Sequence, residues 1–182
     1  MTDRLVVRAA RLDDLAEIVE LRLALLREYG DAPLYARLRP DVDERARELY
    51  FAQLVAPHET MLLAERRGQI VGILRCVDTT ASPLLLPERY CYVSSVYVRP
   101  AERRRGVLRA LVAAAEKWCA ERGIGEMRLH NSASSSFIGQ VWEAFGFEVV
   151  EHVRRRVLPI GRDALGSPPH SHAAHAREEK AR

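Results

Sequence analysis

The sequence predicts an α/β domain with a mixed sheet flanked by helices, in the order β-α-α-β-β-β-α-β-α-β. Short apolar runs alternate with segments of helical periodicity, the pattern of a layered α/β fold. The 182 residues are 48% hydrophobic and 29% charged, which suits one globular domain and excludes chain-wide disorder, collagen and coiled coil. The strand expected at residues 90–98 has no charge on either face, as expected of a central strand covered on both sides.

The first half supplies two helices and three strands. A short strand is expected at residues 5–9, and Asp14 with Glu17 has the spacing of a capping box, so a helix follows and ends at Gly30. Residues 31–40 form a loop, and 42–54 a second helix. Strands at 60–65 and 70–77 flank Arg67-Gly68-Gln69, which predicts a hairpin because glycine supplies positive φ.

The second half begins with an apolar loop at 79–88 and the strand at 90–98. Alternation predicts that one face carries Tyr92, Ser94, Val96 and Val98, and the other Cys91, Val93, Ser95 and Tyr97. A helix follows the arginine run and ends at Gly123. A strand at 127–130, a helix at 134–145 and a last strand at 147–158 complete the domain, residues 1–159. Residues 160–182 have almost nothing to bury and are expected to be a disordered tail.

Composition also bears on compartment and ligands. The three cysteines, Cys76, Cys91 and Cys119, form no metal-binding spacing and have apolar neighbours, so we expect buried thiols in a reducing compartment. The N-terminus is too polar for a signal peptide, and no apolar run is long enough to span a membrane, so we expect a cytoplasmic protein without membrane contact. No metal site is expected, and the histidines of the tail are interpreted as part of a solvated terminus.

The segment from 96 to 111 carries the chemistry. A covered strand ends, a basic turn containing Gly106 follows, and a helix begins at once. The first N–H groups of a helix lack intrahelical partners and its dipole makes that end positive, so together with Arg103, Arg104 and Arg105 this turn is suited to bind a diphosphate. The alternative is a solvated basic turn before an ordinary helix.

This segment resembles the acetyl-CoA-binding motif of the GNAT acetyltransferase superfamily, Arg/Gln-x-x-Gly-x-Gly/Ala, with Arg103, Gly106 and Leu108 at the patterned positions after Val98-Arg99-Pro100. The resemblance covers residues 4–158 and includes the segments 7–14, 67–72 and 142–147. It implies an acetyl-CoA-dependent N-acetyltransferase in which an amine attacks the thioester directly. The residues that it implies in cofactor binding are Val96, Tyr97, Val98, Arg103, Arg104, Arg105, Gly106, Val107, Leu108, Arg109 and Asn131.

Two positions depart from the family pattern. Leu108 stands where Gly or Ala allows close approach of the pyrophosphate; its side chain narrows the site, shifts the phosphate, or points into the core. Trp142 stands where many members have a tyrosine general acid, and an indole N–H is no acid near neutral pH. Either the thiolate leaves unprotonated, or a hydroxyl such as that of Ser135 serves as the general acid, or the chain binds acyl-CoA without turnover. Trp142 is otherwise simply a core aromatic.

The general base is left unassigned by the sequence. The strand at 90–98 lacks the glutamate that family members often place there, so the candidates are Tyr92, Ser94, Glu88 and His130. Histidine is the side chain that ordinarily titrates nearest neutral pH, although a lone histidine on a strand is more often structural.

Two other functional classes compete with the enzyme. One is a GNAT-fold module that binds acyl-CoA without catalysis. The other is nucleic-acid association through Arg103–Arg105 and Arg154–Arg156, which is disfavoured because the second cluster alternates across a strand and no aromatic residues interleave with it. The net charge of +3 is also too small to indicate nucleic acid.

The acceptor is expected to be a small-molecule or peptide amine, chosen by residues 31–48 and 79–89. Acidic residues of the first segment either attract a cationic amine or serve as capping charges; they are Asp31, Asp41, Asp43 and Glu44. The exposed last strand is compatible with a homodimer.

Overall fold

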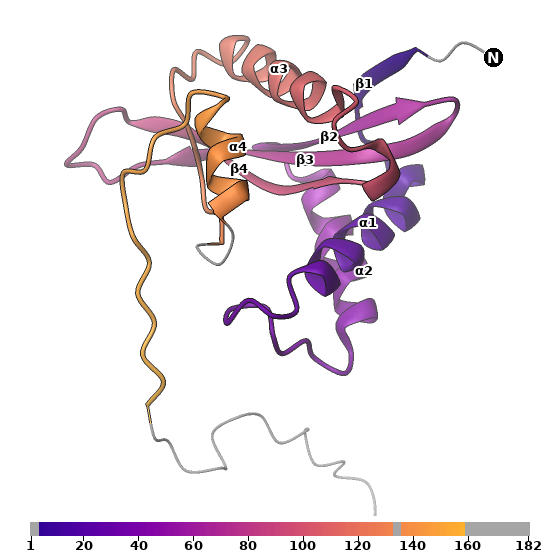
Figure 1. The fold of residues 1–182 in the computed structure, drawn as a ribbon. Coiled ribbons are helices and arrows are strands. Elements are labelled where there is room, and N and C mark those ends of the chain that lie inside the picture. The colour runs from indigo at the N-terminus through magenta and orange to yellow at the C-terminus, as the bar shows by residue number, and fades with distance from the viewer. Residues whose placement is uncertain (1–3, 133–135, 159–182) are drawn as a thin grey trace, which may run out of the picture. The chain divides into compact units, whose positions relative to one another are not determined.

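The computed structural model describes residues 4–132 and 136–158, and its centre is a five-stranded sheet. The strands β1 (Leu5–Ala9), β2 (Glu59–Arg66), β3 (Gln69–Thr80), β4 (Arg89–Val98) and β5 (Met127–Leu129) lie in sequence order across the sheet. Neighbours from β1 to β4 are antiparallel, whereas β4 and β5 are parallel. The expected mixed sheet is therefore confirmed (Figure 1).

Helices cover both faces of this sheet. α1 (Leu15–Glu28) and α2 (Val42–Val55) pack on one face, around a cluster that includes Ile18, Leu63 and Tyr97. α3 (Val107–Ala120) and α4 (Ser136–Glu143) lie on the other, around a cluster that includes Leu74, Leu111 and Trp142. Figure 1 shows α3 above the sheet and α1 and α2 below it. Within the described residues, no helix combines the length and the apolar character needed to cross a bilayer.

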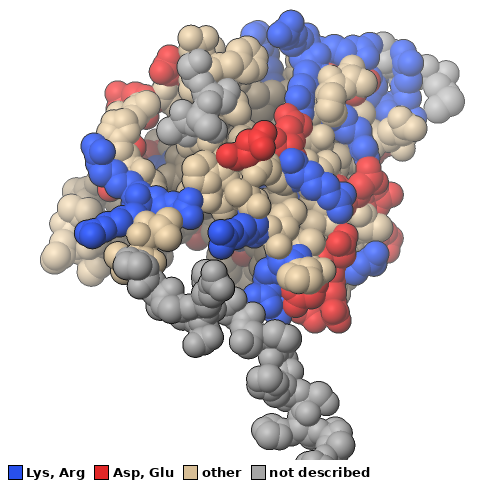
Figure 2. Space-filling view, turned by 60° about the horizontal axis from the view of Figure 1, so that its bottom comes forward, with Lys and Arg blue, Asp and Glu red and all other residues tan. Residues whose placement is uncertain are grey.

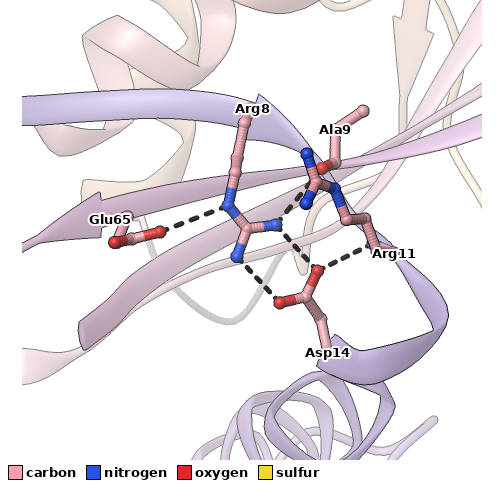
Figure 3. A network of polar contacts seen from close by, with 5 residues as sticks. All are labelled: Arg8, Ala9, Arg11, Asp14 and Glu65. Carbon is pink, nitrogen blue, oxygen red and sulfur yellow. Dashed lines mark hydrogen bonds and ion pairs between the residues drawn. The ribbon is translucent and has the colours of Figure 1, made fainter. Parts of the chain in front are cut away.

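The entry to α1 is fixed by an ion-pair network rather than by the expected capping box. Asp14 makes no side-chain cap to α1; instead it accepts a hydrogen bond from the backbone N–H of Arg11 at 2.7 Å. Both guanidinium Nη atoms of Arg8, on β1, donate to its two carboxylate oxygens at 2.7 and 2.8 Å, and Arg8 Nε donates to Glu65 on β2 (Figure 3). The network ties the first strand, the second strand and the start of α1 together, and it holds the pKa of Asp14 below its usual range through the Arg8 hydrogen bonds.

The β2–β3 hairpin is confirmed. Arg66 pairs with Gln69, which leaves a two-residue turn of Arg67 and Gly68 with φ of 53° and 77°. Positive φ at both turn positions is what a type I′ turn requires, and that turn matches the twist of the two strands.

β4 contains a bulge that changes which residues share a face. Arg75 of β3 pairs with Ser94, and Ile73 of β3 pairs with Tyr97. Two steps along β3 therefore correspond to three steps along β4. Ser95, within these three steps, has φ of 59°. One extra residue in β4 reverses the alternation beyond it. The predicted faces are therefore wrong after Ser94: Tyr97 packs on the α1–α2 side, whereas Val96 and Val98 pack with Cys91 and Val93 on the α3 side.

The last predicted strand is not formed. The chain divides into two compact units, residues 1–147 and 148–182, and residues 148–158 of the second unit contain neither strand nor helix. Their valines are exposed, from 67% for Val149 to 78% for Val150. Alternation shows which face a strand would bury, but a strand also needs a neighbour to satisfy its N–H and C=O groups. The tail expected at 160–182, with its histidines, lies outside the described residues.

The three cysteines are free and buried, as predicted. Cys76 and Cys91 lie on neighbouring strands and Cys119 on α3, all within the same apolar cluster. A hydrogen bond with the Cys76 thiol and burial raise the pKa of Cys91, and burial raises the pKa of Cys119 to about 12. These thiols are therefore unreactive core residues rather than nucleophiles.

Candidate functional site

The central feature of the site is a fork between β4 and β5. The two strands pair at Cys91–Met127, Tyr92–Arg128 and Val93–Leu129, and within the described chain the pairing stops there. From Ser94 onward, β4 continues for five residues beside β3 alone, through the bulge at Ser95. The fork thus leaves backbone groups of β4 available to a ligand at a position where the chain is also irregular.

The turn that follows β4 leads into the start of α3. Arg104 and Gly106 both have positive φ, of 61° and 81°, and Gly106 is the residue before the helix. A Cβ placed on Gly106 would meet no atom within 4 Å, so the space beside this backbone is open. The first N–H groups of α3 consequently face a region in which an anion can approach the backbone closely.

The arginines of this turn differ in their partners. Arg103 donates to Glu28 of α1 at 2.6 Å, and Arg105 donates to Glu102 at 3.1 Å. Glu102 also accepts from Arg66 of β2 at 2.9 Å. By contrast, Arg104 and, in the first turn of α3, Arg109 are exposed and form no ion pair within the described part of the chain. These two side chains are the ones free to neutralise a bound phosphate.

Leu108 does not obstruct the turn. It is half-buried and packs against the apolar cluster beneath α3, beside Val107 and Leu111. Of the three orientations that the sequence left open, the structure shows the side chain directed into the core. The backbone N–H of this residue still lies in the first turn of the helix.

Trp142 is a core aromatic. It is 8% exposed and lies in the apolar cluster on the α3 side of the sheet, with ring centroids 5.4 Å from Phe147 and 6.2 Å from Phe145. Ser135, the candidate acid, lies outside the described residues.

Two of the four candidate bases are brought together. The hydroxyl of Tyr92 on β4 lies 2.9 Å from Nδ1 of His130, which directly follows β5, so the pair lies where the fork begins. Burial raises the pKa of Tyr92, and Tyr35 from the α1–α2 segment adds to this effect, while Arg75 opposes it. Tyr92 is thus a neutral hydroxyl at neutral pH, able to orient the imidazole.

Ser94 takes part in a separate network. Its hydroxyl accepts from Arg75 at 3.3 Å, and Arg75 donates to the nearly buried Glu59 at 2.5 Å.

Glu88 directly precedes β4, six residues before Ser94, and so lies at the opposite end of the strand from the bulge. Asn131 follows His130 and is exposed, and its amide donates to the Ser132 carbonyl at 3.3 Å.

The acidic residues of the α1–α2 segment are partly neutralised. Asp41 binds Arg39 and Arg45 at 3.0 and 2.6 Å, which lowers its pKa to about 2, and Asp43 lies 3.9 Å from Arg27. Figure 2, which brings this side of the molecule forward, shows acidic and basic side chains interleaved. These aspartates therefore do not form an uncompensated attractive surface for a cation.

Several residues that build the site were missed by sequence reasoning. Glu28, Glu59 and Glu102 lie on three different elements, and nothing in their local sequence marks them as partners of Arg103, Arg75 and Arg66. The β4 bulge carries no sequence signal either. Positive φ is usually adopted by glycine, but the residue that adopts it here is Ser95.

Comparisons with known proteins agree with this geometry. The model of the acetyltransferase (GNAT) family matches residues 22–147. Aminoglycoside N(6')-acetyltransferase type 1 of Salmonella typhimurium is 34% identical over 62 residues, and this match spans 34% of the chain but only 43% of the relative's length.

Solved structures show the same fold. A GCN5-related N-acetyltransferase from Ralstonia eutropha superposes with a TM-score of 0.69 at 23% identity, over 85% of this chain and 99% of that one. A predicted acetyltransferase from Clostridium acetobutylicum, solved with acetyl-CoA, gives a TM-score of 0.68 at 18% identity, over 85% and 96%.

Proposed function

Because the chain belongs to the GNAT acetyltransferase family, we propose that it transfers the acetyl group of acetyl-CoA to a primary amine by direct attack in a ternary complex. The observation that carries the proposal is the continuity of three features along one segment: the β4–β5 fork, the bulge at Ser95, and the open first turn of α3. A ligand that has an extended arm and a diphosphate fits this arrangement, in which an unpaired strand edge is followed by a helix N-terminus.

The chain's own residues fit acetyl-CoA as co-substrate. The N–H groups at the start of α3, next to the open backbone of Gly106, hold the diphosphate, and Arg104 and Arg109 neutralise it. The backbone of Val96 to Val98 receives the pantetheine arm in the fork. We expect Arg103 and Arg105 to contribute through backbone groups of the turn, because their side chains are engaged by carboxylates.

One backbone N–H group and one side chain then assist the acetyl transfer. A backbone N–H at the bulge donates to the oxygen that gains negative charge when the amine attacks the thioester carbonyl. His130 accepts the amine's proton at Nε2, which requires that Nδ1 carry its own proton and donate to the hydroxyl oxygen of Tyr92. The pair is exposed to solvent, so the proton passes on to water.

The buried position of Trp142 bears on the leaving thiol. With its ring packed between Phe145 and Phe147, Trp142 supplies no acid, and the thiolate leaves unprotonated or takes a proton from solvent. A thiol is a good enough leaving group for this route, since its ordinary pKa is about 8.5. The role of Asn131 is to contact the cofactor or acceptor from the end of β5.

Binding is the first test. Calorimetric titration with acetyl-CoA is expected to show micromolar affinity for the native protein. Arg104→Ala and Arg109→Ala should weaken binding by about tenfold each, the equivalent of one charge-assisted contact of ~1.4 kcal/mol. Lys117→Ala, which removes an exposed cation at the far end of α3, is the matched control. No binding by the native protein contradicts the assignment.

Turnover is the second test. An amine panel containing an aminoglycoside, a polyamine and a peptide N-terminus, with detection of the released thiol, identifies the acceptor class. His130→Asn and Tyr92→Phe should lower kcat, the former by about 10²-fold or more. Micromolar acetyl-CoA binding with no thiol release from any amine would favour the non-catalytic acyl-CoA-binding module instead.

We also propose a cytoplasmic homodimer. Three free thiols support a reducing compartment, and β5, the end strand of the sheet, together with the exposed valines of 148–158, supports association of two chains. Light scattering during gel filtration tests the dimer, and a monomeric mass at micromolar concentration contradicts it.

A further inference from the structure

Arg103, the first residue of the proposed cofactor motif, is bound to the end of α1, next to the segment expected to select the acceptor. Its Nη2 lies 2.6 Å from Glu28 Oε2, its Nε donates to the Val98 carbonyl at 3.0 Å, and its guanidinium lies 5.7 Å from the centre of the Tyr97 ring. The Arg103–Glu28 pair is about half exposed on both sides, so it contributes little to stability. Its geometric effect is to fix the end of α1 to the turn that precedes α3.

A second contact joins α1 to this turn. Arg99 donates to Glu20 of α1 at 2.8 Å and to the Ile70 carbonyl of β3 at 2.9 Å. Glu20 and Glu28 are eight residues apart, about 12 Å along a helix. The turn 99–106 is thus attached to α1 at two separate points.

The Glu28 contact is followed directly by the segment that joins α1 to α2. Tyr29 ends α1, and its ring lies 5.8 Å from that of Tyr35. Contacts therefore lead from Arg103 to Glu28, and through the adjacent Tyr29 to Tyr35.

We propose that Arg103 is a positioning residue which, through Glu28, couples occupation of the cofactor turn to the order of the acceptor segment, residues 29–36. This inference rests on the proposed function, because it takes coenzyme A as the ligand of the turn. A ligand that holds the turn also holds the end of α1, and so orders the segment that follows it. Coupling of this kind is reciprocal, so an acceptor bound at that segment strengthens cofactor binding.

Amide hydrogen exchange with and without coenzyme A tests the coupling. The segment supplies suitable probes, since the N–H groups of Tyr29, Gly30, Ala32 and Tyr35 donate to Leu25, Arg27, Tyr29 and Ala32 at 2.8–3.2 Å. In the native protein, coenzyme A should slow exchange of these amides at least about fivefold, the lower end of typical coupling between sites. In Glu28→Gln, coenzyme A should bind with the same Kd within about twofold, but slow the same amides by less than about 1.5-fold.

Two further variants make the test decisive. Lys117→Ala breaks a more exposed ion pair on α3, away from the turn, and should keep the native response. The charge exchange Arg103→Glu with Glu28→Arg should recover part of the coupling that Glu28→Gln loses. Equal slowing in the native protein and Glu28→Gln, or none in the native protein despite measured binding, overturns the coupling alone. Absence of coenzyme A binding by the native protein overturns the proposed function as well, so the two failures are distinguishable.

Discussion

Gly72 on β3 lies directly against α3, and Gly72→Ala is the sharpest test of how the turn before α3 is held. A Cβ there would lie 2.9 Å from Val107 Cγ1, 3.2 Å from Leu111 Cδ1 and 3.2 Å from the Tyr97 carbonyl oxygen. One of these neighbours is backbone, so the strain is not relieved by side-chain rotation alone. Overpacking of this kind costs about 1–3 kcal/mol. For a chain of this length each kcal/mol lowers Tm by about 2–4 °C.

The same substitution should affect ligand binding, because Val107 is the first residue of α3. Displacement of that residue moves the N–H groups proposed to hold the diphosphate. A loss of only ~0.7 kcal/mol in that contact raises the Kd for coenzyme A about threefold. Differential scanning calorimetry and calorimetric titration on the same preparation measure both effects.

Gly125→Ala is the matched control, since its Cβ would meet no atom within 4 Å and its φ is not positive. It should match the native protein in Tm and in coenzyme A affinity. If Gly72→Ala melts within about 1 °C of the native protein, the close packing of α3 on β3 is wrong. If Tm falls but coenzyme A binds unchanged, the start of α3 does not hold the diphosphate in the way proposed.

Three other predictions concern the frame of the site. Arg8 holds the pKa of Asp14 below its usual range, so this carboxylate stabilises the fold above about pH 4 and stops doing so as the pH falls through its folded-state pKa. Urea unfolding should therefore show Asp14→Asn less stable by about 1–3 kcal/mol at pH 7, with a smaller difference at pH 3. Leu108→Ala should lose about 1–2 kcal/mol of stability and gain no affinity for coenzyme A in titration; tighter binding would show that the leucine obstructs the turn. The three thiols, including Cys119 with its pKa near 12, should not react with a disulfide reagent in the native protein, and all should react in guanidinium chloride; fast labelling of the folded chain would contradict their burial.

Local chemistry is the part of this protein that the sequence reveals well. Residues 96–111 predicted a strand, a basic turn and a helix, and the structure has β4, the turn and α3 in that order. The hairpin at Gly68 was also predictable, because a two-residue turn with positive φ depends on its own residues. For Leu108 the sequence left three orientations open, and only its packing against the core cluster selects the inward one.

Features that depend on neighbours in space were not predictable in the same way. The bulge at Ser95 arises from the pairing of β4 with β3, and it reversed the faces expected for Val96 and Tyr97. The strand expected after residue 147 has the right alternation but is not formed in residues 148–158, because alternation does not supply a pairing partner.

What the sequence determined by itself was the order of the elements up to α4 and the location of the basic turn before α3, since helix starts, glycine turns and charge runs are set by residues close together in the chain. Only the tertiary structure decided which arginines of that turn are free. Arg103 is bound by Glu28, 75 residues away, whereas Arg104 beside it has no such partner in the described chain. Identical side chains in one run thus take different roles, because the partners that distinguish them are brought there by folding.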